Sequence, residues 1–273
     1  MPMAELPSDS CSVDDLWACY VLEDRPREAL ALAPGWARRW TTSWRLTGSE
    51  VVCPVRDLAA VPFVGSEPVR RFTWRARQRH RPGLQFLVST GRHHGFESLA
   101  EQRLLLALDF AGELVDVLAQ PFRLRFATMT GWREHIPDFL AVTRGGRWLL
   151  DVRPRERIGA DALVAFAAAD EAALASGWRY GVVTGWRPHV LSTLDTLSSQ
   201  RRELDDRLGL QTELIAISKA GPCCFGELVA ATSLPAVARA HALHLLWHRR
   251  LGVDLAQPLT DRSLVWPAAQ ACS

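Results

Sequence analysis

The spacing of apolar residues changes along the chain from that of a helix to that of strands. Residues 95–110, GFESLAEQRLLLALDF, contain a helical stripe of leucines. Two apolar runs, ELVDVLA and FRLRFA, then predict strands joined at Gln120-Pro121. The next two, IPDFLAVT and RWLLDVR, predict a hairpin that turns at Gly145-Gly146. An alanine-rich helix at 160–177, a strand RYGVVT and a further helix follow, so the series predicts an α/β sandwich.

The pattern changes after Gly209. TELIAISKAG, FGELVAATS and PAVARAHALHLLWHRRL predict three helices with tight Gly, Pro and Ser joints, and VDLAQPL and RSLVWP predict two short extended pieces. Three helices followed by a β-ribbon are typical of a winged helix-turn-helix, in which residues 235–251 take the place of the recognition helix. Those residues include basic side chains that are candidates for lining a DNA groove, but their leucines and Trp247 indicate a core role. We therefore expect partner docking slightly ahead of DNA reading here.

The start of the chain is poorly patterned. Short apolar pieces are interrupted by Pro34, Pro54 and Pro62, which predicts an N-terminal extension with some helix and little core of its own. The expected organisation is an extension over residues 1–68, an α/β domain over 69–208 and a winged-helix domain over 209–273.

Composition narrows the class of protein. Apolar residues make up 48% of the chain, enough for a buried core, and charged residues interrupt every long apolar stretch, so we expect no membrane span. The six cysteines form no CxxC pair and are expected to be reduced thiols of a cytoplasmic protein. The net charge of +2 is too small to identify a nucleic-acid binder, and Lys219 is the only lysine. Arginine must therefore supply almost any cation that a site needs.

The segment HIPDFLAVTRGGRWLLDVRP contains the most distinctive acidic residues. Asp138 follows a proline at the start of one predicted strand, and Asp151 shares a face of the next strand with Arg153. An acid and a base on an otherwise apolar strand are costly unless they pair or serve a site. Mg²⁺ prefers oxygen ligands, so we expect the two carboxylates to converge within a few ångströms as a metal site. The simpler alternative is that Asp151 and Arg153 form an ion pair and Asp138 caps a turn.

Two further carboxylates open the helix at 95–110. Glu97 and Glu101 are four residues apart and so lie on one helical face. A metal site can draw on either of them. Ser98-x-x-Glu101 is also a capping-box pattern, in which Glu101 would only close the N-terminus of the helix.

Residues 69–82, VRRFTWRARQRHRP, are rich in arginine. They are interpreted either as an arm that contacts DNA phosphates or as a solvated strand or loop. The arginines that would contact phosphate are Arg70, Arg71, Arg75, Arg77 and Arg79.

Four short motifs in this order resemble the PD-(D/E)xK nuclease signature, and more narrowly the TnsA-like endonuclease subunits of heteromeric transposases. The matching segments are Phe96-Glu97-Ser98 with Glu101, Ala119-Gln120-Pro121-Phe122, His135-Ile136-Pro137-Asp138-Phe139 and Leu150-Asp151-Val152-Arg153-Pro154. The resemblance extends over about residues 69–266 and includes the segment that ends at Arg92. It implies a restriction-endonuclease-like mixed sheet flanked by helices, followed by the winged helix.

The resemblance implies that Glu101 (or Glu97), Asp138 and Asp151 hold one or two Mg²⁺ ions, with Mn²⁺ as a second candidate metal. It also implies that Gln120 and Arg153 belong to the catalytic set and that Arg92 and His135 contact DNA. The family has lysine where this chain has Arg153, and arginine is a poor base because it keeps its proton. A subunit of this kind is expected to nick one strand of double-stranded DNA at transposon ends. Its implied partners are a DDE transposase and an AAA+ ATPase on separate chains. The expected location is the cytoplasm, in association with the nucleoid.

Two other functions stay open. A non-catalytic DNA-binding or assembly subunit of the same complex would keep the fold after losing turnover through the change from lysine to arginine. A phage-defence nuclease would use the same core outside transposition.

Overall fold

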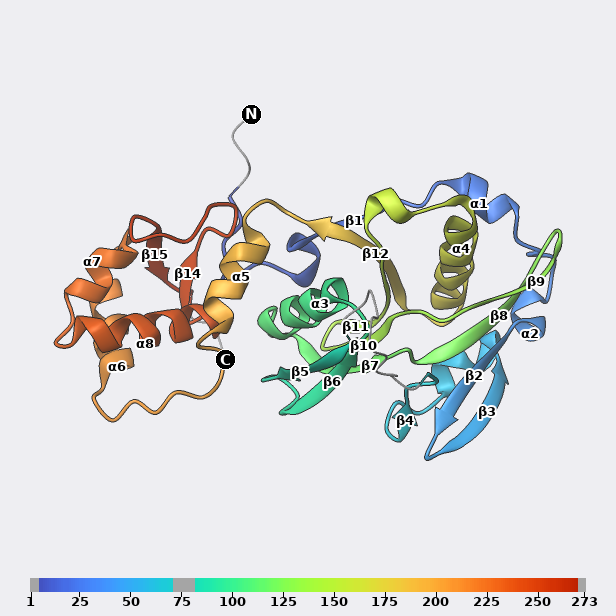
Figure 1. The fold of residues 1–273 in the computed structure, drawn as a ribbon, viewed down its shortest axis with the longest axis horizontal. Coiled ribbons are helices and arrows are strands. Elements are labelled where there is room, and N and C mark those ends of the chain that lie inside the picture. The colour runs from blue at the N-terminus through green and yellow to red at the C-terminus, as the bar shows by residue number, and fades with distance from the viewer. Residues whose placement is uncertain (1–4, 71–81, 270–273) are drawn as a thin grey trace. The chain divides into compact units, whose positions relative to one another are not determined.

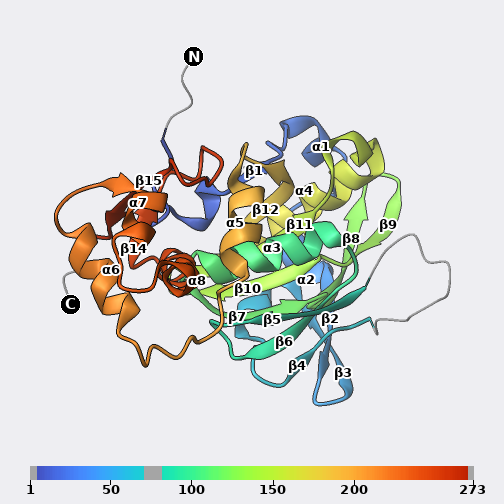
Figure 2. The same cartoon turned by 60° about the vertical axis from the view of Figure 1, so that its left-hand side comes forward.

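The computed structural model describes residues 5–70 and 82–269, which fold into two compact units (Figures 1 and 2). The sheet unit consists of residues 18–105 and 113–185, and the C-terminal unit of residues 1–17, 106–112 and 186–273, each as far as its residues are described. The units do not follow the expected boundaries at 68 and 208. Residues 18–68 share a unit with the hairpin, and residues 186–208 belong with the C-terminal helices.

A five-stranded mixed sheet lies at the centre of the sheet unit (Figure 1). Its order is β1 (Trp17–Cys19), β12 (Arg179–Trp186), β11 (Gly146–Val152), β10 (Phe139–Thr143) and β7 (Leu114–Ala119). Strand β10 is antiparallel to both β7 and β11, whereas β11 is parallel to β12. The predicted hairpin is confirmed, and so is the α/β class.

A second, antiparallel sheet is built partly from the start of the chain. Its order is β3 (Ser49–Pro54), β2 (Thr41–Leu46), β8 (Phe122–Thr128) and β9 (Gly131–His135), with β4 (Ser66–Glu67) paired to β2. Strands β5 (Gly83–Leu87) and β6 (Arg92–Phe96) form a separate antiparallel hairpin. The helices of this unit are α1 (Asp24–Glu28), α2 (Trp36–Arg39), α4 (Ala160–Ala175) and the first part of α3 (Leu99–Phe110), with 3-10 turns at Val55–Ala60 and Arg155–Arg157.

One hydrophobic core joins both sheets to α4. Trp40 and Trp44 are fully buried with Phe122 and Phe126, and the same cluster contains Leu140 and Leu149 of the mixed sheet. The alanines of α4, which lack bulky side chains, pack closely against this cluster. The expectation that residues 1–68 have little core is therefore wrong for the tryptophans of this segment, which are central to the sheet unit.

The C-terminal unit contains helices α5 (Val190–Ser198), α6 (Leu210–Ser218), α7 (Phe225–Ala230) and α8 (Pro235–Trp247), and a 3-10 turn at Val13–Asp15. Its three-stranded antiparallel sheet has the order β13 (Cys223–Cys224), β15 (Leu264–Pro267) and β14 (Leu251–Val253). The N-terminal residues continue this sheet beyond β14, because Ser8 N–H donates to the Val253 carbonyl at 2.9 Å and Leu255 N–H donates to the Leu6 carbonyl at 2.8 Å.

Two further sequence predictions concern the state of the cysteines and the presence of a membrane span. The cysteines within residues 5–70 and 82–269 are free thiols. None of the helices in these ranges combines the length and apolar character needed to cross a membrane.

Candidate functional site

The hairpin brings Asp138 and Asp151 to neighbouring positions. Phe139 pairs with Leu150, so the residue before β10 comes opposite Asp151 near the end of β11. The Val152 N–H donates to Asp138 Oδ2 at 2.7 Å, and the Gln120 N–H donates to the Asp138 carbonyl at 2.7 Å. Burial raises the pKa of Asp138 well above its usual value, and the charges of Asp151 and Glu101 raise it further. The two aspartates therefore lie side by side on the sheet, and the negative charge of Asp151 contributes to the raised pKa of Asp138.

Asp151 is 2% exposed and receives hydrogen bonds from two side chains. The Tyr180 hydroxyl donates to Oδ2 at 2.6 Å, and His135 Nε2 lies 3.0 Å from the same oxygen. The His135 ring packs edge-on against Phe166 of α4, with 5.9 Å between centroids. Burial raises the pKa of the Tyr180 hydroxyl well above its usual range, and the Asp151 charge raises it further, so Tyr180 keeps its proton and remains a donor.

Glu101 takes part in a capping interaction at the start of α3. Its Oε1 accepts a hydrogen bond from the Ser98 hydroxyl at 2.8 Å, and its Oε2 accepts one from the Glu97 N–H at 2.7 Å. The Ser98 hydroxyl in turn accepts the Glu101 N–H at 3.2 Å. The Glu97 carboxylate lies 3.5 Å from the Arg70 guanidinium. Both glutamates line the same cleft as the aspartates, and Glu101 also has the structural role that its spacing predicted.

Arg153 is exposed and lies just beyond β11. Its Nε donates to the Arg157 carbonyl at 3.4 Å. Among the described residues it forms no ion pair with Asp151, which is instead bonded to Tyr180 and His135. The simple pairing of Asp151 with Arg153 is therefore not found, and the guanidinium group lines the cleft.

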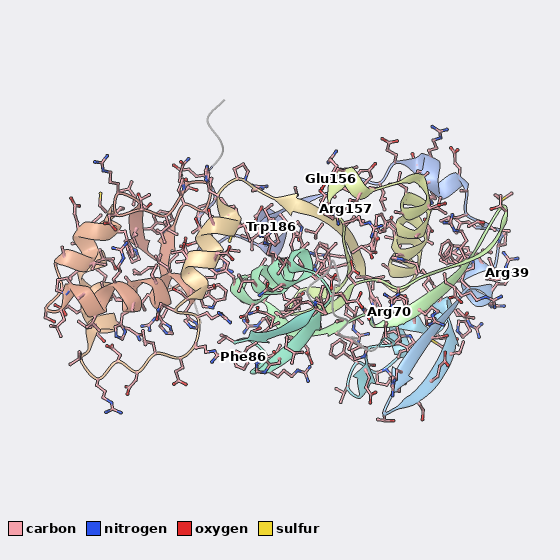
Figure 3. All side chains as sticks on the ribbon, in the orientation of Figure 1. Arg39, Arg70, Phe86, Glu156, Arg157 and Trp186 are labelled. Carbon is pink, nitrogen blue, oxygen red and sulfur yellow. The ribbon has the colours of Figure 1, made fainter. Side chains whose placement is uncertain are left out.

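These side chains line a cleft of about 850 Å³, whose lining contains both carboxylates and arginines. Figure 3 labels two of the arginines, Arg70 and Arg157. The others are Arg123, Arg133 and Arg153. The sequence did not lead us to predict three of them as site residues, namely Arg123, Arg133 and Arg157. The alternation of side chains along β8, FRLRF, does direct Arg123 away from the core face. Three of these arginines have acidic partners, since Glu97 lies 3.5 Å from Arg70, Glu134 lies 3.7 Å from Arg123 and Asp161 lies 3.0 Å from Arg133.

Some predicted site residues lie elsewhere. Gln120 is buried with a φ of 47° and does not line the cleft, although its backbone supports Asp138. Arg92 also lies outside the cleft lining and pairs with Asp116. His135, predicted to contact DNA, lines the cleft but is directed to Asp151. The predicted phosphate contacts Arg71, Arg75, Arg77 and Arg79 lie outside the described residues.

The donor chemistry of the cleft fits a hard cation. Within residues 5–70 and 82–269, no three His, Cys, Asp or Glu side chains are grouped so as to hold a metal ion by themselves. Mg²⁺, however, is commonly bound by only one or two carboxylates and completes its shell with water and substrate phosphate. Asp138 and Asp151 supply two carboxylates, and a cation between them would relieve the repulsion that contributes to the raised pKa of Asp138.

The basic side chains of α8 and the residues after it have partners within the C-terminal unit. Arg239 pairs with Asp261 at 2.8 Å, and Arg249 donates to the carbonyls of Ala111 and Cys11. The remaining contacts join His241 and Arg250 to Gln211, His244 to the Gln200 carbonyl and His248 to the Arg201 carbonyl. These side chains therefore stabilise the unit, which disfavours their use as readers of DNA bases.

Comparison with known proteins leaves the cleft to be interpreted from its own residues. The sequence matches no protein-family model, and no curated protein is significantly similar to it.

Proposed function

We propose that this protein is a metal-dependent DNA endonuclease that hydrolyses a phosphodiester bond in the cleft between Asp138 and Asp151. The observation that carries the proposal is the placement of these two carboxylates opposite each other inside a cleft lined by arginines. Hard anionic ligands suit Mg²⁺ or Mn²⁺, and arginines suit the phosphates of a DNA strand.

The order of elements around the cleft supports this proposal. Helix α3 is followed by the antiparallel strands β7, β10 and β11, then by α4 and the parallel strand β12. Asp138 lies just before β10 and Asp151 lies near the end of β11, where the resemblance to PD-(D/E)xK nucleases implies the metal ligands. Strands β8 and β9 are inserted between β7 and β10.

Each side chain then has a distinct role. Asp138 and Asp151 would hold the metal, which when bound polarises the scissile phosphate and lowers the pKa of an attacking water. Arg153 offsets negative charge that develops on the phosphate. Arg70 and Arg157 bind the DNA backbone at the cleft. Glu101 caps α3 and adds a negative charge near Asp138.

The transposition setting is a further part of the proposal. The C-terminal unit has the order α6, β13, α7, α8, β14 and β15, and this order supports the proposal of a winged helix-turn-helix. Because the basic side chains around α8 are bonded within the unit, this domain suits docking of a partner better than reading of bases. The partners implied by the TnsA-like resemblance are a DDE transposase and an AAA+ ATPase, which act with this subunit at transposon ends.

A non-catalytic assembly subunit is the second candidate function. The observation that favours it is that Arg153, in the lysine position of the family, is hydrogen-bonded to the Arg157 carbonyl rather than to Asp151. Such a subunit would bind DNA through the same arginines without cleaving it.

Cleavage of supercoiled plasmid in Mg²⁺ and in EDTA tests the proposal. We expect nicking by the wild type in Mg²⁺, none in EDTA, and none by Asp138→Asn. The matched control is Asp195→Asn, an exposed aspartate of α5 in the C-terminal unit, which should nick like the wild type. Plasmid binding without cleavage by the wild type would favour the assembly subunit, and equal nicking by Asp138→Asn would exclude this cleft as the active site.

A further inference from the structure

The Asp151 carboxylate is held by two side chains from separate elements. Tyr180 lies on β12, whose register with β11 pairs it with Leu149 and so places it on the same face of the sheet as Asp151. His135 ends β9 of the second sheet. The two sheets thus each supply one side chain to a single carboxylate.

Both contacts reach the same oxygen. Tyr180 donates to Oδ2 at 2.6 Å and His135 Nε2 lies 3.0 Å from it. With Oδ2 fixed in this way, rotation of the carboxylate is restricted and Oδ1 is the oxygen available to an outside ligand. The residues behind this arrangement are themselves packed, since His135 contacts Phe166 and Tyr180 packs against the core cluster.

We infer that Tyr180 and His135 are positioning residues that orient Asp151 Oδ1 as a metal ligand. This inference rests on the proposed function. Side chains that hydrogen-bond a metal-binding group fix its orientation, and their loss typically weakens metal affinity or activity by about tenfold to a hundredfold. Asp138 has a different support, the backbone N–H of Val152, so the two aspartates depend on different parts of the fold.

The decisive variant is Tyr180→Phe, which removes only the donating hydroxyl. The chain has one other tyrosine, and Tyr20→Phe is the matched control because Tyr20 lies against Arg155 rather than Asp151. His135→Ala removes the second donor, whereas His135→Gln replaces the ring nitrogen with an amide N–H at a similar reach. Thermal unfolding of each variant is recorded, so that loss of fold is recognised.

Two readouts are combined. Calorimetric titration of EDTA-stripped protein with MnCl₂, without DNA, measures metal binding, and plasmid nicking against Mg²⁺ concentration gives the half-saturating concentration. For Tyr180→Phe and His135→Ala we expect both values to weaken by about tenfold or more. Tyr20→Phe should match the wild type, and His135→Gln should recover most of the loss.

A merely structural role would lower the unfolding temperature of Tyr180→Phe and leave both metal readouts unchanged. That result, in a wild type that binds Mn²⁺ and nicks DNA, would overturn the inference and leave the proposed function standing. A wild type that neither binds Mn²⁺ nor nicks DNA would overturn both.

Discussion

Replacement of Arg153 distinguishes a catalytic role of its positive charge from a purely structural role of the side chain. Arg153→Ala removes the guanidinium group from the cleft, and Arg153→Lys replaces it with the cation that the resembled family uses. The change should cost the fold little, because the Arg153 side chain is exposed and donates a hydrogen bond of only 3.4 Å to the Arg157 carbonyl. Exposed substitutions of this kind change the free energy of unfolding by only about 0.5 kcal/mol.

The expected effect on catalysis is much larger. A removed electrostatic stabiliser raises the activation barrier by about 3–4 kcal/mol, which corresponds to a loss of about two to three orders of magnitude in rate. Because this exceeds the effect on stability several-fold, loss of folded protein does not explain it. Lysine keeps the charge, so nicking by Arg153→Lys should equal or exceed that of the wild type.

The assay is single-turnover nicking of supercoiled plasmid in Mg²⁺, with thermal unfolding measured on the same preparations. Arg155→Ala is the control, since Arg155 is an exposed arginine two residues away that stacks on Tyr20 and does not line the cleft. Equal nicking rates for the wild type, Arg153→Ala and Arg153→Lys, all folded, would refute a role for Arg153 in the chemistry.

Three other outcomes follow from the structure. Burial and neighbouring charges raise the pKa of Asp138 above 3.8 in the folded protein. The stability associated with the protonated carboxyl is therefore lost as pH rises through that folded-state pKa. In EDTA at pH 8, Asp138→Asn should unfold at a higher temperature than the wild type, and the difference should shrink toward pH 4. Glu101→Gln removes the charge; its amide oxygen can still accept the Glu97 N–H and its NH2 can donate to the Ser98 hydroxyl, so unfolding should change by less than about 1 kcal/mol while nicking falls. Unchanged nicking would assign Glu101 to capping alone. Gly252→Ala would place a Cβ against the Trp266 indole and should cost about 1–3 kcal/mol in denaturant unfolding, whereas Gly185→Ala, in open space, should be nearly neutral; equal midpoints would show that the indole moves freely.

The part of the site that was predictable is local in sequence. The alternation of side chains along a strand and a short turn after Thr143 together bring Asp138 opposite Asp151. The capping box at Ser98 and Glu101 was equally visible, because its two residues are three apart. In each case the chain itself fixes the distance between the groups.

The unpredicted part depends on pairing between distant segments. Tyr180 reaches Asp151 only because β12 pairs in parallel with β11 in one register, and no local pattern specifies that register. Likewise, β2 joins β8 through pairs such as Thr42 with Leu124, so a segment with weak periodicity of its own becomes part of a sheet. Propensity and spacing describe neighbours in sequence, whereas these contacts are decided by tertiary packing.

The docking of the N-terminal residues onto β14 has a consequence for the order of folding. Ser8 and Val253 are 245 residues apart and Cys11 and Arg249 are 238 apart, so these N-terminal residues leave the ribosome long before their partners exist. Loop closure over such separations is slow, and until it happens one edge of the small C-terminal sheet stays open. Until residues 6–8 dock, the β14 edge has unpaired backbone groups to which a strand of another chain can bond.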